Sequence, residues 1–200
     1  CTTYNGNTSV GSKSVNFTLT VPASVKPTLT SITAARIDGD VPSSWGIYVQ
    51  NKSSVKLTIN GAAGAYGSTI KSYSISGGSY AGTGSTLTTG ALVSSGSLTF
   101  TGKVTDSRGR VSDTKTVTIS VVAYSAPAFS SYLSQRCLSN GTLDEDGTYV
   151  HALLRYVYSS CSGKNTITTK TEYRKVGDSQ WTNAGKTFAS GTAVVFGNGQ

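Results

Sequence analysis

The chain has 200 residues, and its composition narrows the fold class before any motif is considered. Serine and threonine supply 60 residues and glycine another 23, whereas charged residues make up only 13% of the chain. Helix surfaces need Ala, Leu, Glu and Lys, so this composition argues against a helical bundle and favours strands joined by tight turns. No apolar run approaches the roughly 20 residues that span a bilayer, so we expect no membrane partner.

The net charge of +8 is spread evenly along the chain. Residues 1–100 carry 6 basic and 2 acidic side chains and residues 101–200 carry 11 and 7, which gives +4 in each half. Nucleic-acid-binding proteins concentrate their basic residues in a patch, so we expect no nucleic acid partner. The three cysteines form no CxxC pair and have no histidine at a metal-binding spacing, which predicts neither a zinc site nor another cofactor.

Several short segments alternate apolar and polar residues, beginning with Val15, Phe17, Leu19 and Val21. The same alternation returns over residues 55–59, 98–100 and 117–121, with glycine-rich turns between the segments. A period of two is typical of half-buried strands, and no apolar period of 3.6 residues is found. The sequence therefore predicts an all-β chain of antiparallel sandwiches.

An internal repeat suggests how these strands are grouped. FTLTVPASVKP (17–27) is echoed by VTISVVAYSAP (117–127) at an offset of 100 residues. Less common residues extend the match: Arg36 with Arg136, Tyr48-Val49 with Tyr149-Val150, Tyr73 with Tyr173, and Tyr80 with Trp181.

This register predicts three parts. Residues 26–124 form one complete domain, and residues 125–200 form a second domain without counterparts of the strands at 97–105 and 113–122. Residues 1–25 are then expected to be the C-terminal hairpin of a preceding β domain, which makes the chain a fragment of a longer protein.

Five segments of the chain also carry a family resemblance. They are CTTYNG (1–6), SKSVNFTLTVP (12–22), WGIYVQNKSSVKLTI (45–59), GAYGSTIKSYSIS (64–76) and VTDSRGRVSDTKTVTI (104–119). They resemble minor structural proteins of siphophages from Gram-positive hosts, and the resemblance covers essentially the whole chain. It implies a tail-associated virion protein with immunoglobulin-like repeats, assembled in the cytoplasm of the bacterial host.

A second resemblance concerns TKTEYRKVGDSQW (169–181), which looks like the third strand and following turn of a fibronectin type III domain. Together with the repeat, it predicts tandem β-sandwich domains of the immunoglobulin-like or fibronectin type III-like kind.

No catalytic group emerges from the motifs. His151 is the single histidine, and strand parity places it outward beside Tyr149 and Arg155, with Val150 facing inward in the same way as Val49. A solvent-facing strand histidine explains this position better than a general base, and no GxSxG motif accompanies it. A cell-wall hydrolase is therefore the least favoured of three functional hypotheses, and we expect no enzyme activity.

The acidic turn around Asp144 and Asp146 could offer oxygen ligands to Ca²⁺. The twelfth residue counted from Asp144 is Arg155, where an EF-hand has glutamate, so an ordinary solvated turn is the stronger interpretation.

Four residues are candidates for contacts at the surface. Arg108 and Arg110 lie in a predicted hairpin turn, where they are either solvated or able to bind an anionic polymer such as teichoic acid. Tyr48 and Tyr149 share the outward parity of His151, so they are candidates for stacking on sugars or for packing across strands.

The leading hypothesis is a non-enzymatic structural module of a phage tail appendage, which spaces or displays a host-binding element. Its partners would be other virion tail proteins and, in a homo-oligomer, further copies of itself. The alternative is an adhesin domain that binds a glycan or teichoic acid on a Gram-positive cell.

Overall fold

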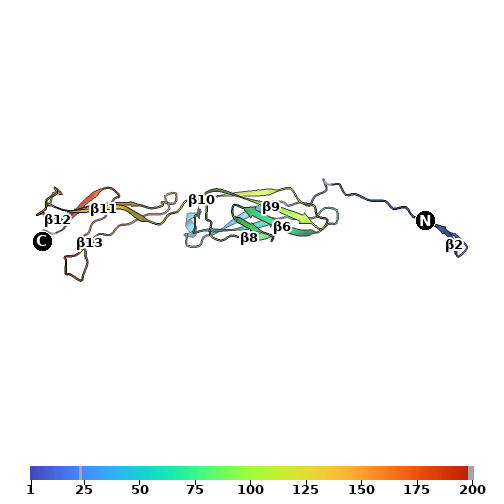
Figure 1. Ribbon diagram of the computed structural model, residues 1–200, viewed down its shortest axis with the longest axis horizontal. Helices are drawn as coiled ribbons and strands as arrows, with labels where there is room; N and C mark the ends of the chain where they lie inside the picture. Colours follow the sequence, from blue (N-terminus) through green and yellow to red (C-terminus); the bar gives the residue numbers. More distant parts are fainter. Residues whose placement is uncertain (23, 198–200) are drawn as a thin grey trace.

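The structure is a computed structural model that describes residues 1–22 and 24–197. Within these residues there is no α-helix, and one turn of 3-10 helix, η1, spans Ser43–Trp45. The strands lie in a row along the long axis of the molecule, from an N-terminal hairpin through a central unit to a C-terminal unit (Figure 1). No helix in the described part of the chain could cross a membrane. The predicted all-β class is confirmed.

The central unit, residues 28–122, contains two sheets. The first has the order β3-β5-β8, with antiparallel neighbours, from β3 (Ser31–Ile37), β5 (Ser54–Asn60) and β8 (Thr86–Thr88). The second has the order β4-β10-β9-β6-β7, from β4 (Tyr48–Val49), β10 (Lys115–Val122), β9 (Gly96–Asp106), β6 (Ile70–Gly77) and β7 (Tyr80–Gly82). Strand β4 is parallel to β10, and the other pairs are antiparallel.

The two sheets of the central unit share one apolar core. Strand β5 buries Val55, Leu57 and Ile59 between more exposed neighbours, and the other sheet contributes Phe100 and Ile119. The predicted alternation along residues 55–59 and 117–121 is confirmed, because one face of each strand meets this core. On the opposite face, hydroxyl groups bond across the strands, as in the 2.8 Å contact between Thr99 Oγ1 and Thr118 Oγ1.

The C-terminal unit, residues 128–196, repeats the smaller sheet of the central unit. Its sheet has the order β11-β12-β15, from β11 (Ala128–Cys137), β12 (Tyr149–Val157) and β15 (Ala193–Phe196), all antiparallel. The opposite sheet is reduced to the hairpin of β13 (Glu172–Tyr173) and β14 (Thr182–Asn183). No strand described in this unit takes the place of β9 or β10, so its apolar side chains are mostly exposed or half-buried.

The strand pairing corrects one part of the sequence repeat. Arg36 pairs with Val55, and Arg136 pairs with Val150. Val150 therefore corresponds to Val55, whereas the sequence match aligned it with Val49. The connection before β12 is shorter than the connection before β5, so the C-terminal unit has no counterpart of β4.

The N-terminal segment contains a short hairpin of β1 (Thr2–Asn5) and β2 (Thr8–Ser12). The strand predicted over residues 15–21 is wrong for this structure, because that segment pairs with no other strand among the described residues. It runs extended between the hairpin and the central unit (Figure 1), with Phe17 and Leu19 80% and 85% exposed. Alternating residues favour a strand only where a neighbouring strand supplies hydrogen bonds and a face to pack on.

Candidate functional site

The turn that follows β9 is organised by the buried carboxylate of Asp106. One oxygen, Oδ1, accepts hydrogen bonds from the backbone N–H groups of Arg108 (3.0 Å) and Arg110 (2.9 Å). The other oxygen accepts from Nε and Nη2 of Arg110, at 3.0 and 2.7 Å. Gly109 adopts a left-handed conformation with φ of 77°, which lets the chain turn back within these few residues. The side chain of Arg110 is therefore bound inside the molecule.

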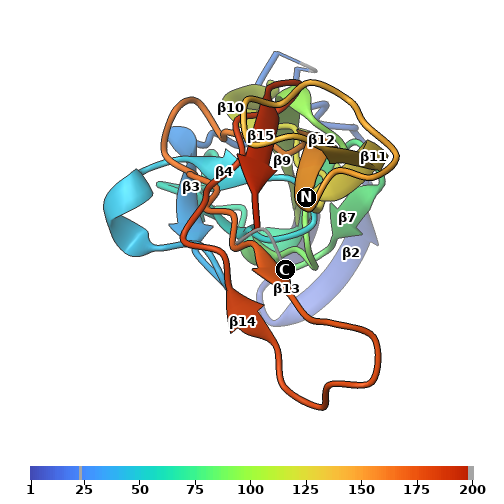
Figure 2. The same cartoon turned by 90° about the vertical axis from the view of Figure 1, so that its left-hand side faces the viewer.

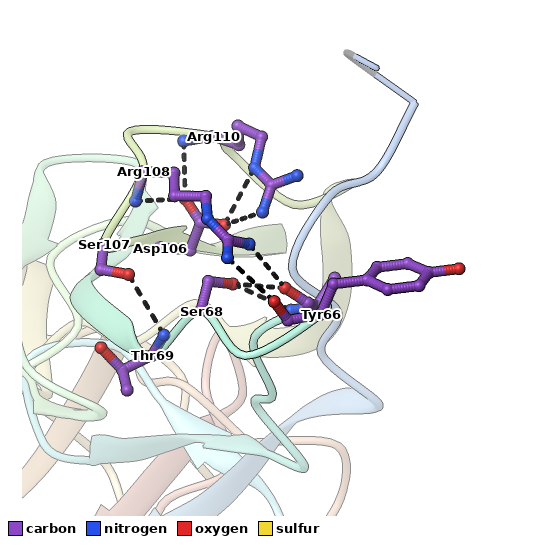
Figure 3. Close-up of polar contacts among 8 residues, drawn as sticks. Tyr66, Ser68, Thr69, Asp106, Ser107, Arg108 and Arg110 are labelled. Carbon is purple, nitrogen blue, oxygen red and sulfur yellow. Dashed lines mark hydrogen bonds and ion pairs between the residues drawn. The ribbon is translucent and has the colours of Figure 1, made fainter. Parts of the chain in front are cut away.

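Arg108 fixes a second loop from the same turn. Its Nη1 and Nη2 atoms donate to the carbonyl oxygens of Ala65 and Tyr66, at 3.0 and 2.9 Å (Figure 3). Tyr66 has a left-handed backbone with φ of 50°, which is uncommon for an aromatic residue. Its ring is 84% exposed and points away from the unit (Figure 3). The two hydrogen bonds from Arg108 thus hold a strained loop, and this loop presents one aromatic side chain to solvent.

These hydrogen bonds also set the acidity of Asp106. Burial raises its pKa, but the opposing bonds from the backbone and side chain of Arg110, with those from Ser68 and Arg108, lower it to about 2. The carboxylate therefore stays ionised at neutral pH and well into the acidic range, so the turn keeps its charged form there.

The structure therefore gives both predicted surface arginines internal partners. Arg108 and Arg110 were candidates for binding an anionic polymer, and their guanidinium groups are occupied by Ala65, Tyr66 and Asp106. Tyr66, which is 84% exposed, is the large aromatic side chain that this loop offers to solvent.

Tyr48 and Tyr149 are half-buried, which fits the alternative of packing across strands better than a fully exposed ring. Tyr48 packs on the main core of the central unit, and burial raises the pKa of its phenol although Arg36 opposes the shift. Val49 is buried, as predicted, but in a smaller cluster at the end of the unit and not with Val55 and Leu57. The turn at residues 50–53 separates β4 from β5, so parity does not carry from one strand to the next.

The acidic turn at Asp144 and Asp146 and the single histidine, His151, do not form a common site in the described structure. Oδ1 of Asp144 accepts a hydrogen bond from the backbone N–H of Asp146 (2.9 Å), which is the geometry of a local turn. Among the described residues, no three metal-binding side chains come together. His151 is half-buried and not solvent-facing, because Gln135 and Val195 flank it on the neighbouring strands.

A packed junction joins the central and C-terminal units, and sequence reasoning missed it. Val41 and Val49, at the end of the central unit, form a buried cluster with Cys161 of the C-terminal unit. Trp45 and Tyr124 pack around this cluster. Cys161 is 3% exposed, and burial raises the pKa of its thiol. No spacing or motif signals a contact between residues that lie 120 positions apart.

Hydrogen bonds reinforce the junction on both sides of the connecting segment. The side-chain oxygen of Gln50 accepts from the backbone N–H of Tyr124 at 3.3 Å, and Nζ of Lys52 lies 5.7 Å from the centre of the Tyr124 ring. The backbone N–H of Ser125 donates to Oγ of Ser159 at 2.7 Å. The connecting segment is thus bound to both units.

The hairpin of β13 and β14 projects from the side of the C-terminal unit (Figure 2). The guanidinium carbon of Arg174 lies 4.8 Å from the ring centre of Trp181, a cation–π arrangement. Trp181 is 58% exposed, and Val176 at the tip has no cover at all. This hairpin places an aromatic ring and a positive charge together on the surface.

The protein is elongated and all-β, and the side-chain contacts described above stabilise its turns and the junction between its two units. A family model described as "Siphovirus protein of unknown function (DUF859)" matches residues 1–192. The chain belongs to this family of siphovirus proteins, which confirms that it is a phage protein and suggests a structural role with association to the virion. A search of curated proteins gave no match.

Replacing the carboxylate at the turn tests its role. We expect Asp106→Asn to lower the melting temperature at neutral pH, because the amide cannot accept all the bonds from Arg110. The folded pKa of about 2 lies below the ordinary value of 3.8, so the contribution is complete above pH 3.8 and disappears as the pH falls through about 2. The melting difference between variant and wild type should shrink over this range.

Asp113→Asn is the matched control, since Asp113 forms an exposed ion pair with Lys26 at 2.9 Å. Exposed pairs contribute little, so the control should melt close to the wild type at neutral pH. A melting difference for Asp106→Asn that stays constant down to pH 2 would contradict the assigned role.

Proposed function

We propose that the chain is a non-enzymatic structural module of the phage virion, located in a tail appendage, where it spaces or displays a host-binding element. In this proposal, residues 26–124 and 125–200 are tandem sandwich domains of the immunoglobulin-like or fibronectin type III-like kind. The observation that carries the proposal is the packed junction between the two units.

A spacer must hold the parts at its two ends at a fixed distance and angle, and the junction is suited to that task. Only residues 123–127 connect β10 to β11, and this short segment includes Pro127, which limits backbone rotation. The apolar cluster around Cys161 and the hydrogen bonds at Gln50 and Ser125 add contacts on either side of it. Units joined in this way keep a fixed angle, in contrast to domains on a flexible linker.

The arrangement of polar side chains supports a role without catalysis. His151 lies between Gln135 and Val195 on the sheet, so its neighbours on the adjacent strands are an amide and an apolar side chain. The carboxylate with a strongly shifted pKa, Asp106, is occupied by structural hydrogen bonds. In this proposal both groups therefore serve the packing of the sheet and the turn.

A charge placed in the junction should loosen the fixed angle between the central and C-terminal units. We expect Cys161→Asp to broaden the distribution of distances measured by small-angle X-ray scattering and to reduce the radius of gyration, because a buried carboxylate disrupts the cluster. Ser162→Asp is the matched control: Ser162 is exposed and shares the left-handed backbone of Cys161, which aspartate tolerates. Identical scattering from the two variants would contradict a rigid spacer.

Labelling of the virion tests the proposed location. Antibody against this chain, detected by gold particles in electron micrographs, should mark the tail. Label on the capsid would show that the tail assignment is wrong, and label on neither would refute a place in the virion.

A second candidate function, binding to the cell surface, is favoured by the projecting hairpin. A stacked pair of Trp181 and Arg174 provides a flat apolar face for a sugar ring and a positive charge for a phosphate group. The arginines of the turn at 106–110 have internal partners, so this proposal assigns wall contact to the hairpin.

Removing the ring should weaken such binding. In a pull-down with purified cell wall, we expect Trp181→Ala to reduce the bound fraction about tenfold, the usual size of a strong aromatic contact. Val176→Ala on the same hairpin is the control and should bind like the wild type, since the side chain of Val176 is fully exposed and carries neither a ring nor a charge. Absence of wall binding by the wild type would remove this candidate and leave the spacer proposal intact.

A further inference from the structure

A small cavity lies at the junction between the central and C-terminal units, and its volume is about 220 Å³. Val41 and Val49 of the central unit and Cys161 of the C-terminal unit, which form the buried cluster of the junction, are part of its lining. The walls therefore come from both units, so the cavity depends on the contact between them.

Two aromatic side chains line this junction cavity. They are Trp45, at the end of η1, and Tyr124, in the segment that connects the two units. Both residues are half-buried, so their rings are held in place while part of their surface stays accessible. Rings held in this way offer a rigid apolar face on which a flat or saturated ring can stack.

Three polar side chains line the same cavity. Nζ of Lys52 lies 3.6 Å from Oδ2 of Asp40, whose side chain is 84% exposed. Nδ2 of Asn165 donates to the carbonyl oxygen of Ser159 at 2.8 Å, which fixes the amide. An ammonium group donates, a carboxylate accepts, and an amide does both. Because the ion pair has no net charge, this set of groups suits an uncharged ligand that carries several hydroxyl groups.

The backbone around the cavity is strained on both sides. Cys161, Ser162 and Gly163 are left-handed in succession, with φ of 49°, 59° and 76°. Asn51, next to Lys52 on the other side, has φ of 59°. Residues other than glycine rarely adopt this conformation, and where they do they cluster at binding sites and ligand clamps. The strain thus coincides with the cavity.

The size of the cavity limits its ligand. Pockets for drug-sized molecules occupy about 300–1,000 Å³, so a cavity of about 220 Å³ has room for a single ring. A pyranose sugar combines an apolar face of C–H groups with an edge of hydroxyl groups that both donate and accept. These are the properties that the aromatic and polar linings require.

We propose that the junction cavity binds one uncharged sugar ring, either as a free sugar or as the end of a longer polysaccharide. Trp45 and Tyr124 contact the face of the ring. Asp40, Lys52 and Asn165 bind its hydroxyl groups. Since both units contribute to the site, the ring binds the closed junction in preference to an open one, and its binding stabilises the closed junction.

This site is separate from the hairpin of β13 and β14, and it does not depend on where the protein lies in the virion. Its failure would therefore leave both functions proposed above intact, and their failure would leave the sugar site intact.

The fluorescence of Trp45 tests the binding. The full chain has two tryptophans, so Trp181→Phe leaves Trp45 as the single indole. We expect at least one of glucose, galactose, rhamnose and N-acetylglucosamine to change its emission saturably. Half-saturation should fall in the millimolar range, which is the ordinary affinity of a ligand with about a dozen heavy atoms. A polysaccharide that ends in the same sugar should compete if the site takes chain ends, and should not compete if it takes free sugar.

Two aspartates provide a matched pair of variants in the Trp181→Phe chain. Asp40→Asn should weaken sugar binding about tenfold, because a carboxylate accepts a stronger hydrogen bond from a hydroxyl group than an amide does. Asp113→Asn should bind like its parent. The side chain of Asp113 is also 84% exposed and also pairs with a lysine, but it lies outside the cavity.

The reactivity of the thiols gives a second readout. Cys161 lines the cavity and is 3% exposed, so saturating sugar should slow its reaction with iodoacetamide severalfold. Cys1, which is exposed, and Cys137, which is buried outside the cavity, are internal controls whose rates should not change. Peptide mass spectrometry reports the three rates from one sample.

Three results would overturn the proposal. They are the absence of a saturable change with all four sugars, equal weakening by Asp40→Asn and Asp113→Asn, and an equal effect of sugar on all three thiols. The first would mean that the cavity holds no sugar, and the other two would mean that sugar acts elsewhere on the protein.

Discussion

The pairing of β9 with β10 determines whether a unit of this chain can close its core. In the central unit, β9 lies between β6 and β10, and it carries Phe100 into the middle of the apolar cluster. The C-terminal unit has the same three-stranded sheet but no described counterpart of this pair. On β11, Phe129 and Tyr132 are 74% and 83% exposed, whereas Cys137 at its end is buried. Closure of a sandwich depends on a few strands at its centre more than on overall composition.

The ends of the central unit carry its specific loop contacts. At one end of the central unit, Asp106 and Arg108 shape two loops, and at the other end Val41 and Val49 receive Cys161. On the faces between these ends, hydroxyls bond across neighbouring strands, as Ser76 does with Thr101 and Thr99 with Thr118. A protein built in this way uses its loops to set how successive units meet, and its strands to set how far apart the ends lie. This division agrees with a structural role in a phage particle.

The sequence predicted the features that depend on local patterns of residues. It did not predict contacts between residues that lie far apart in the chain. Alternation at Val55, Leu57 and Ile59 identified a strand and its buried face, because period two follows directly from strand geometry. The facing of Tyr48 was wrong because a turn of four residues resets the parity between β4 and β5. The partners of Arg108 are backbone carbonyls about 40 positions away, and no residue type marks them in advance. Residues 15–21 show the remaining limit, since an alternating pattern does not say whether a partner strand is present.

The hydroxyl contacts across the exposed strands have a consequence for the setting in which the protein works. Bonds such as that between Thr99 and Thr118 involve no net charge, so dissolved ions do not screen them. The same is true of the apolar core beneath them. A particle that leaves a concentrated cytoplasm and enters dilute water meets a large drop in ionic strength. Strands held together by neutral groups keep their alignment through that change. The strength of ion pairs on a surface would change with it.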